Sequence, residues 1–315
     1  MKLSLVVPCF NEAENVELFR NTVIEAFANC GYEYEIVFVD DGSTDATAHE
    51  LRKLSKDQQC NTKVIFLSRN FGKEAALYAG LEHASGDYIS LIDADLQQHP
   101  SIVKNMVEIL DQDEEFDVVA AYQDRRSEGK LLSFFKRGFY RVINSLSDVK
   151  FRSDASDFRT FRKSVAQSIL ALGEAHRFSK GIFAWVGFKT HYIPYTAQKR
   201  AAGKTKWGFK KLTNYAVEGI TGFSTKPLRI ATFFGTLTAI AAVIYLIVVV
   251  LQKLITGIDI PGYATIIVLI LALGSMQLFC IGLIGEYVGR TFEQSKNRPI
   301  YLAREVLDNN KKEGR

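Results

Sequence analysis

The sequence predicts an α/β protein: a mostly parallel sheet with helices on both faces, followed by a membrane-spanning hairpin. Short apolar segments alternate with helical stretches from residue 1 to about residue 121, as in proteins that bury a parallel sheet between helices. Charge is unevenly distributed along the chain. Residues 1–124 carry 9 basic and 23 acidic residues, whereas residues 125–229 carry 22 basic and 6 acidic residues. Residues 230–251 and 263–285 contain no charged residue. The average composition, 47% hydrophobic and 23% charged over 315 residues, excludes disordered and collagen-like chains.

Five predicted strands are short, apolar and rich in β-branched residues, as strands buried on both faces are: Leu3–Val7, Glu35–Val39, Lys63–Leu67, Tyr88–Ile92 and Val118–Ala121. Four predicted helices lie between them: Asn15–Ala28, Ala46–Lys56, Lys73–Ala84 and Pro100–Leu110. Ligands of open parallel sheets bind at the carboxyl ends of the strands, so functional residues are expected there.

The two charge-free segments are predicted to span a membrane. They are 22 and 23 residues long, and each would reach about 33 Å as a helix, enough for a hydrocarbon core of about 30 Å. A buried hairpin of a soluble protein is the alternative, but neither segment has a polar face. Residues 199–229 hold eight basic residues and one acidic residue. The positive-inside rule therefore predicts a multi-pass plasma-membrane protein with its N-terminal domain and both termini in the cytoplasm.

Two aromatic and basic segments with helical spacing, about 130–147 and 207–228, are predicted to lie in the membrane interface with Lys and Arg toward phosphate head groups. Ordinary amphipathic surface helices are the alternative. The expected organisation is a globular domain at 1–206, an interfacial helix at 207–228, two spans within 229–288 and a cytoplasmic tail at 289–315.

Cysteine usage and the N-terminus both fit a cytoplasmic domain. Cys9, Cys30, Cys60 and Cys280 lack metal or disulfide spacing, which is typical of a reducing compartment. The apolar stretch at the N-terminus ends at Pro8 and is too short for a signal peptide, so a strand is predicted there.

Polar residues follow the predicted strands where ligands would bind. Asp93 and Asp95 come after the fourth strand, and their like charges would repel unless a cation lay between them. Hard oxygen ligands favour Mg²⁺ or Mn²⁺, with substrate phosphates and water in the remaining positions. Asp40 and Asp41 come after the second strand, and Asp45 is expected to cap the next helix.

No Walker sequence and no G-x-G-x-x-G occurs, which disfavours P-loop NTPases and nicotinamide oxidoreductases. Metal and side-chain cations would then hold any phosphate. The Gly-containing segment 198–207 offers such cations. Arg200 and Lys206 are the expected diphosphate clamp, whereas Lys199 and Lys204 also fit a patch for anionic lipid.

Five segments, VVPCFNEAEN, VDDGSTDAT, DADLQ, SDFR and QKRAAGKTKW, occur in this order. With them the chain resembles the family 2 glycosyltransferases of GT-A fold, whose sheet is Rossmann-like. More narrowly it is similar to the polyprenyl-phosphate glycosyltransferases, the group of bactoprenol glucosyltransferase and dolichol-phosphate mannose synthase. The two-span hairpin matches the bacterial bactoprenol branch, and the resemblance covers nearly the whole chain.

The resemblance implies roles for individual residues. The positions that match those holding the nucleotide base and ribose are Pro8, Phe10, Glu12, Val39 and Asp41. Asp93 and Ala94 match contacts to the nucleotide sugar, Asp95 matches the metal ligand, and Gln97 matches a neighbour of the metal and diphosphate. Asp93 and Gln97 are further candidate metal ligands.

Further matches concern the clamp and the acceptor. Arg200 and Lys206 match the mobile loop that grips the diphosphate, and Asp157 matches an acidic residue proposed as the base. A diphosphate-binding arginine of the mannose synthases aligns with Gln123, so Arg125 or Arg126 is the expected substitute. His99 replaces a proline of the usual motif, and no functional change is expected.

The implied reaction is inverting transfer of a hexose from a nucleoside-diphosphate sugar, UDP-glucose by the bacterial resemblance, to polyprenyl (undecaprenyl) phosphate. UDP-N-acetylglucosamine and GDP-mannose are alternative donors. A processive polysaccharide synthase is disfavoured because Q-x-x-R-W is missing, and a non-catalytic membrane scaffold because Asp93, Asp95 and Arg200 are intact. The expected partners are donor, acceptor, membrane lipids, further copies of the chain, a flippase and a transferase that uses the lipid-linked sugar for the cell envelope. No nucleic-acid partner is expected.

Overall fold

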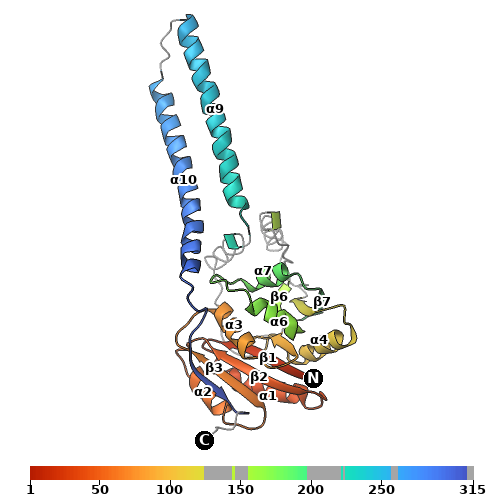
Figure 1. The fold of residues 1–315 in the computed structure, drawn as a ribbon. Helices are drawn as coiled ribbons and strands as arrows, with labels where there is room; N and C mark the ends of the chain where they lie inside the picture. The colour runs from red at the N-terminus through yellow and green to blue at the C-terminus, as the bar shows by residue number, and fades with distance from the viewer. Residues whose placement is uncertain (124–143, 146–154, 197–220, 223, 257–261, 311–315) are drawn as a thin grey trace.

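The computed structural model describes residues 1–123, 144–145, 155–196, 221–222, 224–256 and 262–310. A sheet covered by helices on two faces forms a domain that we call the sheet domain, made of residues 1–123, 155–196 and 303–308 (Figure 1). Two long helices extend away from it as a hairpin (Figure 1).

Seven elements of the first hundred residues alternate between strand and helix: β1 (Lys2–Cys9), α1 (Val16–Phe27), β2 (Glu33–Asp40), α2 (Thr47–Leu54), β3 (Asn61–Leu67), α3 (Lys73–His83) and β4 (Tyr88–Leu91). Two more complete this first half: α4 (Ser101–Gln112) and β5 (Val118–Gln123). Every strand and helix predicted from the sequence in this region is present, with ends that differ by at most a few residues. The apolar, β-branched pattern was a sufficient signal because all five strands are buried.

The second half of the sheet domain contains five elements that sequence analysis did not predict: β6 (Ala155–Arg162), α6 (Lys163–Leu170), α7 (Ser179–Val186), β7 (Thr190–Tyr195) and β8 (Ala303–Asp308). The strand order is β7-β5-β6-β4-β1-β2-β3-β8. The central pairs β4-β1, β1-β2 and β2-β3 are parallel, as is β5-β7. Because β6 and β8 pair antiparallel with their neighbours, the sheet is mixed, with its parallel part at the centre.

Hydrophobic residues on alternate sides of the strands divide the core into two layers. Leu5 and Val7 of β1 join one cluster with α1, α2 and α4, whereas Val6 joins the other with α3, α6 and α7. At Gly80, α3 approaches the sheet so closely that a Cβ atom would lie 2.2 Å from Cγ1 of Val6. The result is the three-layer arrangement that the alternation of strand and helix predicts.

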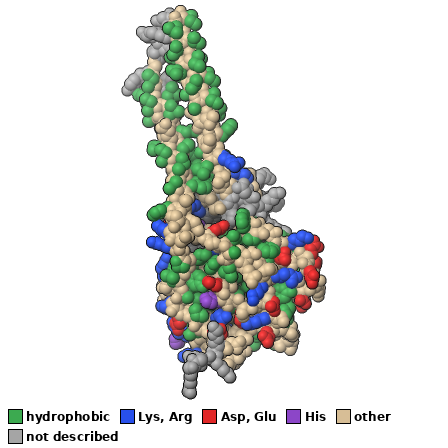
Figure 2. Space-filling view, viewed as in Figure 1, with side chains coloured by type: hydrophobic (Ala, Val, Ile, Leu, Met, Phe, Trp, Pro, Cys, Tyr) green, Lys and Arg blue, Asp and Glu red, His purple; other side chains and the backbone are tan. Residues whose placement is uncertain are grey.

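The hairpin consists of α9 (Lys226–Thr256) and α10 (Tyr263–Ser295). Both helices are long and apolar enough to cross a membrane, with mean hydropathies of 2.6 and 2.5 and no part of either window buried within the protein. Figure 2 shows hydrophobic side chains along the hairpin, with Lys and Arg where its base meets the sheet domain. Each helix contains one of the two predicted spans, 230–251 and 263–285.

The helices are longer than those spans, which corrects two expectations. Residues 226–228, assigned to an interfacial helix, are the first turn of α9. Residues 289–295, assigned to a tail, continue α10, and Ala303–Asp308 of that tail form β8 against β3. The rest of the interfacial segments lies outside the described residues, apart from residues 144–145 and 221–222, which are helical, and residues 224–225, which are not.

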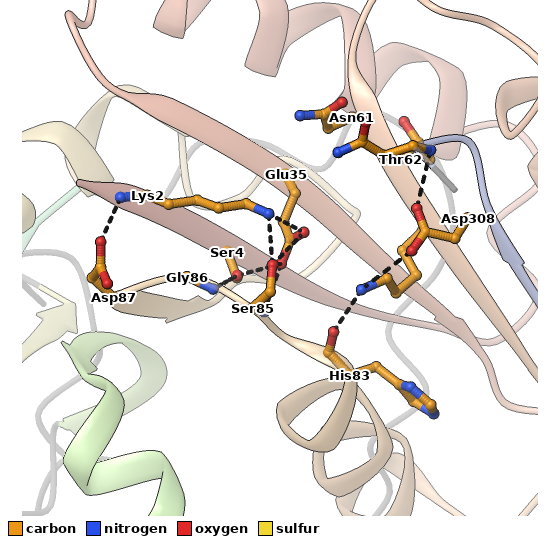
Figure 3. Close-up of polar contacts among 12 residues, drawn as sticks. Lys2, Ser4, Glu35, Asn61, Thr62, His83, Ser85, Gly86, Asp87 and Asp308 are labelled. Carbon is orange, nitrogen blue, oxygen red and sulfur yellow. Dashed lines mark hydrogen bonds and ion pairs between the residues drawn. The ribbon is translucent and has the colours of Figure 1, made fainter. Parts of the chain in front are cut away.

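A polar network closes the sheet at the amino-terminal ends of its strands (Figure 3). The buried carboxylate of Glu35 accepts hydrogen bonds from the hydroxyls of Ser4 and Ser85 and from the backbone N–H of Ser85, at 2.6, 2.8 and 2.7 Å. The ammonium group of Lys2 lies 2.9 Å from the same carboxylate. A cavity of about 250 Å³ beside this network is also lined by Lys63 and Asp308, which pair with each other at 3.6 Å.

Candidate active site

The candidate active site lies at the carboxyl ends of β1, β2 and β4, where segments predicted to be functional meet. Pro8 of β1 is opposite Val39 of β2 in the parallel register. The backbone N–H of Asp41 donates to the carbonyl of Cys9 at 2.9 Å. Three parallel strands therefore end together, and the residues that follow them share one edge of the sheet.

Two loops at this edge are cross-linked by hydrogen bonds. Asn11, with a positive φ of 56°, donates its N–H to the hydroxyl of Ser43 at 2.9 Å and accepts the N–H of Thr44 at 2.9 Å. The N–H of Glu12 donates to the hydroxyl of Thr47 at 2.8 Å, and the Glu12 carboxylate accepts from the side-chain amide of Asn15 at 2.6 Å. Phe10 lies half-buried in the first of these loops. Of the expected base and ribose residues, Phe10 and Glu12 lie in these cross-linked loops, whereas Val39 is fully buried in the core and Asp41 is buried as well.

Asp41 shapes the loop that follows β3. Its buried carboxylate accepts the backbone N–H groups of Phe71 at 2.7 Å and Gly72 at 2.9 Å. Burial raises the pKa of Asp41 above its usual value, although both hydrogen bonds oppose the shift. Gly42 follows with φ of 65°, and a Cβ atom there would lie 2.5 Å from the carbonyl carbon of Arg69. The second strand and the third-strand loop therefore form one unit.

The segment after β4 turns sharply. Leu96 has a positive φ of 57°, and the N–H of Gln97 donates to the carboxylate of Asp95 at 3.1 Å. The N–H of Asp93 donates to the side-chain carbonyl of Gln98 at 3.2 Å, and Ala94 is buried. Asp93, Asp95 and Gln97 thus lie on one short turn, as the D-x-D pattern predicts.

A lysine that sequence analysis did not single out lies between two of the predicted carboxylates. The ammonium nitrogen of Lys73 is 2.6 Å from Oδ1 of Asp93 and 3.7 Å from Oδ2 of Asp157. The side chain of Lys73 is 44% exposed, and those of Asp93 and Asp157 are 36% and 32% exposed. The sequence signal was a lysine at the start of a helix directly after a polar loop, in the segment Ser68–Lys73 that follows the third strand.

Charge around Asp157 keeps it ionised. Burial would raise the pKa of Asp157, but Lys73, Lys180 and Arg159 outweigh burial and lower it. Glu74, the neighbour of Lys73, behaves differently: burial and then the negative charge of Asp157 raise the pKa of Glu74. Glu74 accepts hydrogen bonds from the N–H of Ser179 at 3.0 Å and from the Ser179 hydroxyl. The first turn of α3 is thereby joined to α7.

The remaining predicted site residues lie outside the described residues: Arg125, Arg126, Arg200, Lys206 and the basic residues of segment 130–143. Among the described residues there is no group of three or more His, Cys, Asp or Glu side chains that could hold a metal ion. The donor set at Asp95 is a hard carboxylate on a tight turn, which fits a divalent cation only if substrate oxygens complete its coordination.

The described part of the site is a group of aspartates with one lysine, Lys73, between two of them, and comparisons with known proteins identify the family to which it belongs. Residues 4–170 match the family model "Glycosyl transferase family 2" and residues 226–291 match "GtrB C-terminal hairpin". The chain is 42% identical to a prophage bactoprenol glucosyl transferase homolog of Escherichia coli K12, over 97% of this chain and 99% of that protein.

A second full-length relative is similar in sequence, and a solved structure is similar at much lower identity. The chain is 41% identical to the bactoprenol glucosyl transferase of Shigella phage SfV, over 96% of this chain and 98% of that protein. A solved structure of glucosyl-3-phosphoglycerate synthase from Mycobacterium tuberculosis is 20% identical with a TM-score of 0.49, covering 70% of this chain and 76% of that one. By its family match and its full-length relatives, the chain belongs to the family 2 glycosyltransferases, and its last two helices form a GtrB hairpin.

Proposed function

We propose that this glycosyltransferase moves glucose from UDP-glucose to polyprenyl (undecaprenyl) phosphate with inversion, giving a polyprenyl-monophosphate sugar for the cell envelope. The observation that carries the proposal is at the carboxyl end of β3, where Ser68 donates its N–H to the carbonyl of Leu302 at 2.9 Å. Leu302 lies in the segment that leaves α10, so the candidate site and the hairpin are at the same end of the sheet. An acceptor that stays in the bilayer needs this arrangement.

The names of the relatives support the acceptor and the sugar. Two proteins that match nearly the whole chain at 41–42% identity are named for bactoprenol glucosyl transfer. The match includes the hairpin as well as the sheet domain, so it extends beyond the donor site that family 2 enzymes share.

Asp95 is proposed to hold Mg²⁺ or Mn²⁺, with Asp93 and Gln97 nearby and the donor diphosphate completing the coordination. When bound, the cation would neutralise charge on the departing diphosphate. Arg200 and Lys206 are proposed to grip the same diphosphate, Arg200 by bidentate contacts and Lys206 as a point charge. Pro8, Phe10 and Glu12 are proposed to contact the nucleoside, supported by the buried residues Val39 and Asp41, with Arg125 near the diphosphate.

Asp157 is proposed to orient the acceptor or the sugar hydroxyls. A phosphate monoester has a second pKa of about 6 and is mostly dianionic at neutral pH, so it needs no strong base. The lowered pKa of Asp157 favours its ionised form, which is a weak base and a hydrogen-bond acceptor. Both properties suit orientation better than proton removal.

The proposed topology places the sheet domain and both termini in the cytoplasm. The basic residues that precede α9 support it by the positive-inside rule. Packing of β8 on β3 supports it too, because the chain after the second span returns to the sheet domain. Homo-oligomerisation, a flippase and a transferase that uses the product remain part of the proposal.

The test is transfer of radiolabel into lipid. Membranes that contain the full chain, loaded with undecaprenyl phosphate, are incubated with UDP-glucose, UDP-N-acetylglucosamine or GDP-mannose, and the organic extract is counted. Label from UDP-glucose that is lost in Asp95→Asn supports the proposal. If only UDP-N-acetylglucosamine or only GDP-mannose gave labelled lipid, the proposed donor would be wrong. If no donor gave labelled lipid, the proposed reaction would be wrong.

A further inference from the structure

We propose that Lys73 is a positioning residue of the active site: its ammonium group holds Asp93 and Asp157 in one arrangement and acts on transfer through them, without gripping the donor diphosphate. The inference rests on the proposed function, in which Asp157 orients the reacting groups, and on the contact to the nucleotide sugar that the family resemblance implies for Asp93. Neither the motifs of the sequence nor the family match assigns a role to Lys73.

The sheet brings the two carboxylates to the same lysine. β4 and β6 are antiparallel neighbours, and Leu91 is opposite Arg159. Asp93 follows the end of β4 by two residues, and Asp157 precedes Arg159 by two residues within β6. Both carboxylates lie within 3.7 Å of the Lys73 nitrogen, with Asp93 at 2.6 Å. A charge-assisted bond of that length fixes the geometry of the Asp93 carboxylate.

The backbone of Lys73 is held from two sides. Gly72, directly before it, has φ of 99° and donates its N–H to the carboxylate of Asp41. Glu74, directly after it, accepts two hydrogen bonds from Ser179 at the start of α7. The backbone of Lys73 is therefore fixed between the end of β2 and the start of α7. A side chain that positions other groups needs a fixed backbone of this kind.

The place of Lys73 in its helix is electrostatically unfavourable unless carboxylates compensate. Lys73 is the first residue of α3, where the helix dipole disfavours a cation. Lys180 and Arg159 also face Asp157, so Lys73 is the cation shared by both carboxylates among the ion pairs of the described residues.

This arrangement separates Asp93 from Asp95 in function. An oxygen of Asp93 that is paired with an ammonium group is a poor ligand for a divalent cation. Asp95 lies on the same turn, two residues further on, where its carboxylate accepts the N–H of Gln97. The lysine thus directs Asp93 toward the sugar side of the site and leaves the metal role to Asp95.

The experiment is a double-mutant cycle on the full chain in nanodiscs, combining Lys73→Met with Asp157→Asn. If Lys73 acts through Asp157, Lys73→Met should lower kcat about tenfold to a hundredfold in the wild-type background and less than about threefold in Asp157→Asn. Lys73→Arg keeps the charge and should recover most of the turnover. Lys53→Met is the matched control, since Lys53 also bridges two carboxylates, Glu17 and Glu50, but on the exposed face of α2.

Calorimetric binding of UDP, which lacks the sugar, supplies a readout without turnover. UDP affinity should stay within about threefold in Lys73→Met, whereas a lysine on the diphosphate would lose about tenfold or more. The inference would be overturned if the losses of kcat in Lys73→Met and Asp157→Asn were additive. It would also be overturned if Lys73→Arg did not recover turnover, or if Lys73→Met lost about tenfold or more in UDP affinity. If Lys73→Met unfolds at a lower temperature than Lys53→Met, the cycle is repeated with Lys73→Gln in place of Lys73→Met. Absence of transfer by the wild type contradicts the proposed function instead.

Discussion

The guanidinium group of Arg52 in α2 lies 2.7 Å from the carboxylate of Glu305 in β8, 253 positions later in the chain. The hydroxyl of Tyr301, just before β8, donates to the carboxylate of Glu82 in α3 at 2.6 Å. Between these contacts β8 pairs with β3. The chain that emerges from the hairpin is therefore fastened to the sheet domain, which sets the orientation of the active site relative to α10.

We expect Arg52→Met to destabilise the protein more than Glu305→Gln. The ion pair is about one-third exposed on both sides, so its loss should cost about 0.2–1 kcal/mol. Arg52 also lies over the ring of Phe66, 4.4 Å from the centroid, which should add about 0.5–1 kcal/mol. Thermal unfolding of the detergent-solubilised protein measures both. Equal losses in the two variants would contradict the contribution of Phe66.

Glu35 should make stability depend on pH. Burial would raise its pKa, but hydrogen bonds from Ser4, Lys2 and Ser85 lower it below the ordinary 4.5. Because the pKa is lower in the folded protein, the contribution of Glu35 is present above about pH 4.5 and is lost as pH falls through the folded-state pKa. Glu35→Gln should cost about 2–3 kcal/mol at pH 7 and less at pH 4. The exposed Glu33→Gln in the same strand serves as control, and a cost independent of pH would contradict the prediction.

Metal removal should abolish transfer. Because Asp95 is the proposed ligand, EDTA should stop the reaction, and Mg²⁺ or Mn²⁺ should restore it. Asp95→Asn should lower turnover about a hundredfold or more with an unchanged circular dichroism spectrum. Full turnover in EDTA would remove the metal from the mechanism.

Arg200→Ala should reduce turnover and leave membrane association unchanged. Loss of a charge-assisted contact to the departing diphosphate should cost about 2–4 kcal/mol of transition-state stabilisation, which is about thirty- to a thousandfold in rate. Lys136 and Arg137 lie in the basic segment 130–147 that is predicted to face phosphate head groups, so Lys136→Ala and Arg137→Ala should instead raise the apparent KM for polyprenyl phosphate. Kinetic titrations in nucleotide sugar and in lipid separate the two effects. If Arg200→Ala changed only the lipid KM, Arg200 would belong to the membrane surface.

A protease added outside intact cells should reach only residues 252–262, the link between the two helices. The reason is that positive charges before α9 keep the sheet domain in the cytoplasm. Immunoblotting of tagged fragments, with permeabilised cells as control, measures the cleavage. Cuts within residues 1–229 in intact cells would reverse the topology.

Two parts of this protein could be predicted from local pattern. The strands β1 to β5 and the helices between them were predictable because each buried strand is a short, mostly apolar segment and such segments alternate with helical stretches. The hairpin was predictable because each of its helices contains a charge-free apolar segment that is long enough to cross a bilayer. The polar residues at strand ends followed from the rule for parallel sheets.

The rest depends on contacts between distant segments. β6 contains Asp157, Arg159 and Arg162, and β8 contains Arg304, Glu305 and Asp308, so neither has the apolar pattern of a buried strand. Each becomes a strand because a neighbour, β4 or β3, satisfies its backbone hydrogen bonds. The same pairing brings Asp157 to Lys73 across 84 positions of the chain.

The sequence by itself determined the class of sheet, the spans and the chemistry of the carboxylates, because these follow from residue type and local spacing. The tertiary structure alone decided which cation neutralises Asp93, which segment covers the edge of β3 and where α10 joins the sheet domain. Ion pairs and strand registers depend on distances between residues that are far apart in the chain, and local pattern does not encode those distances.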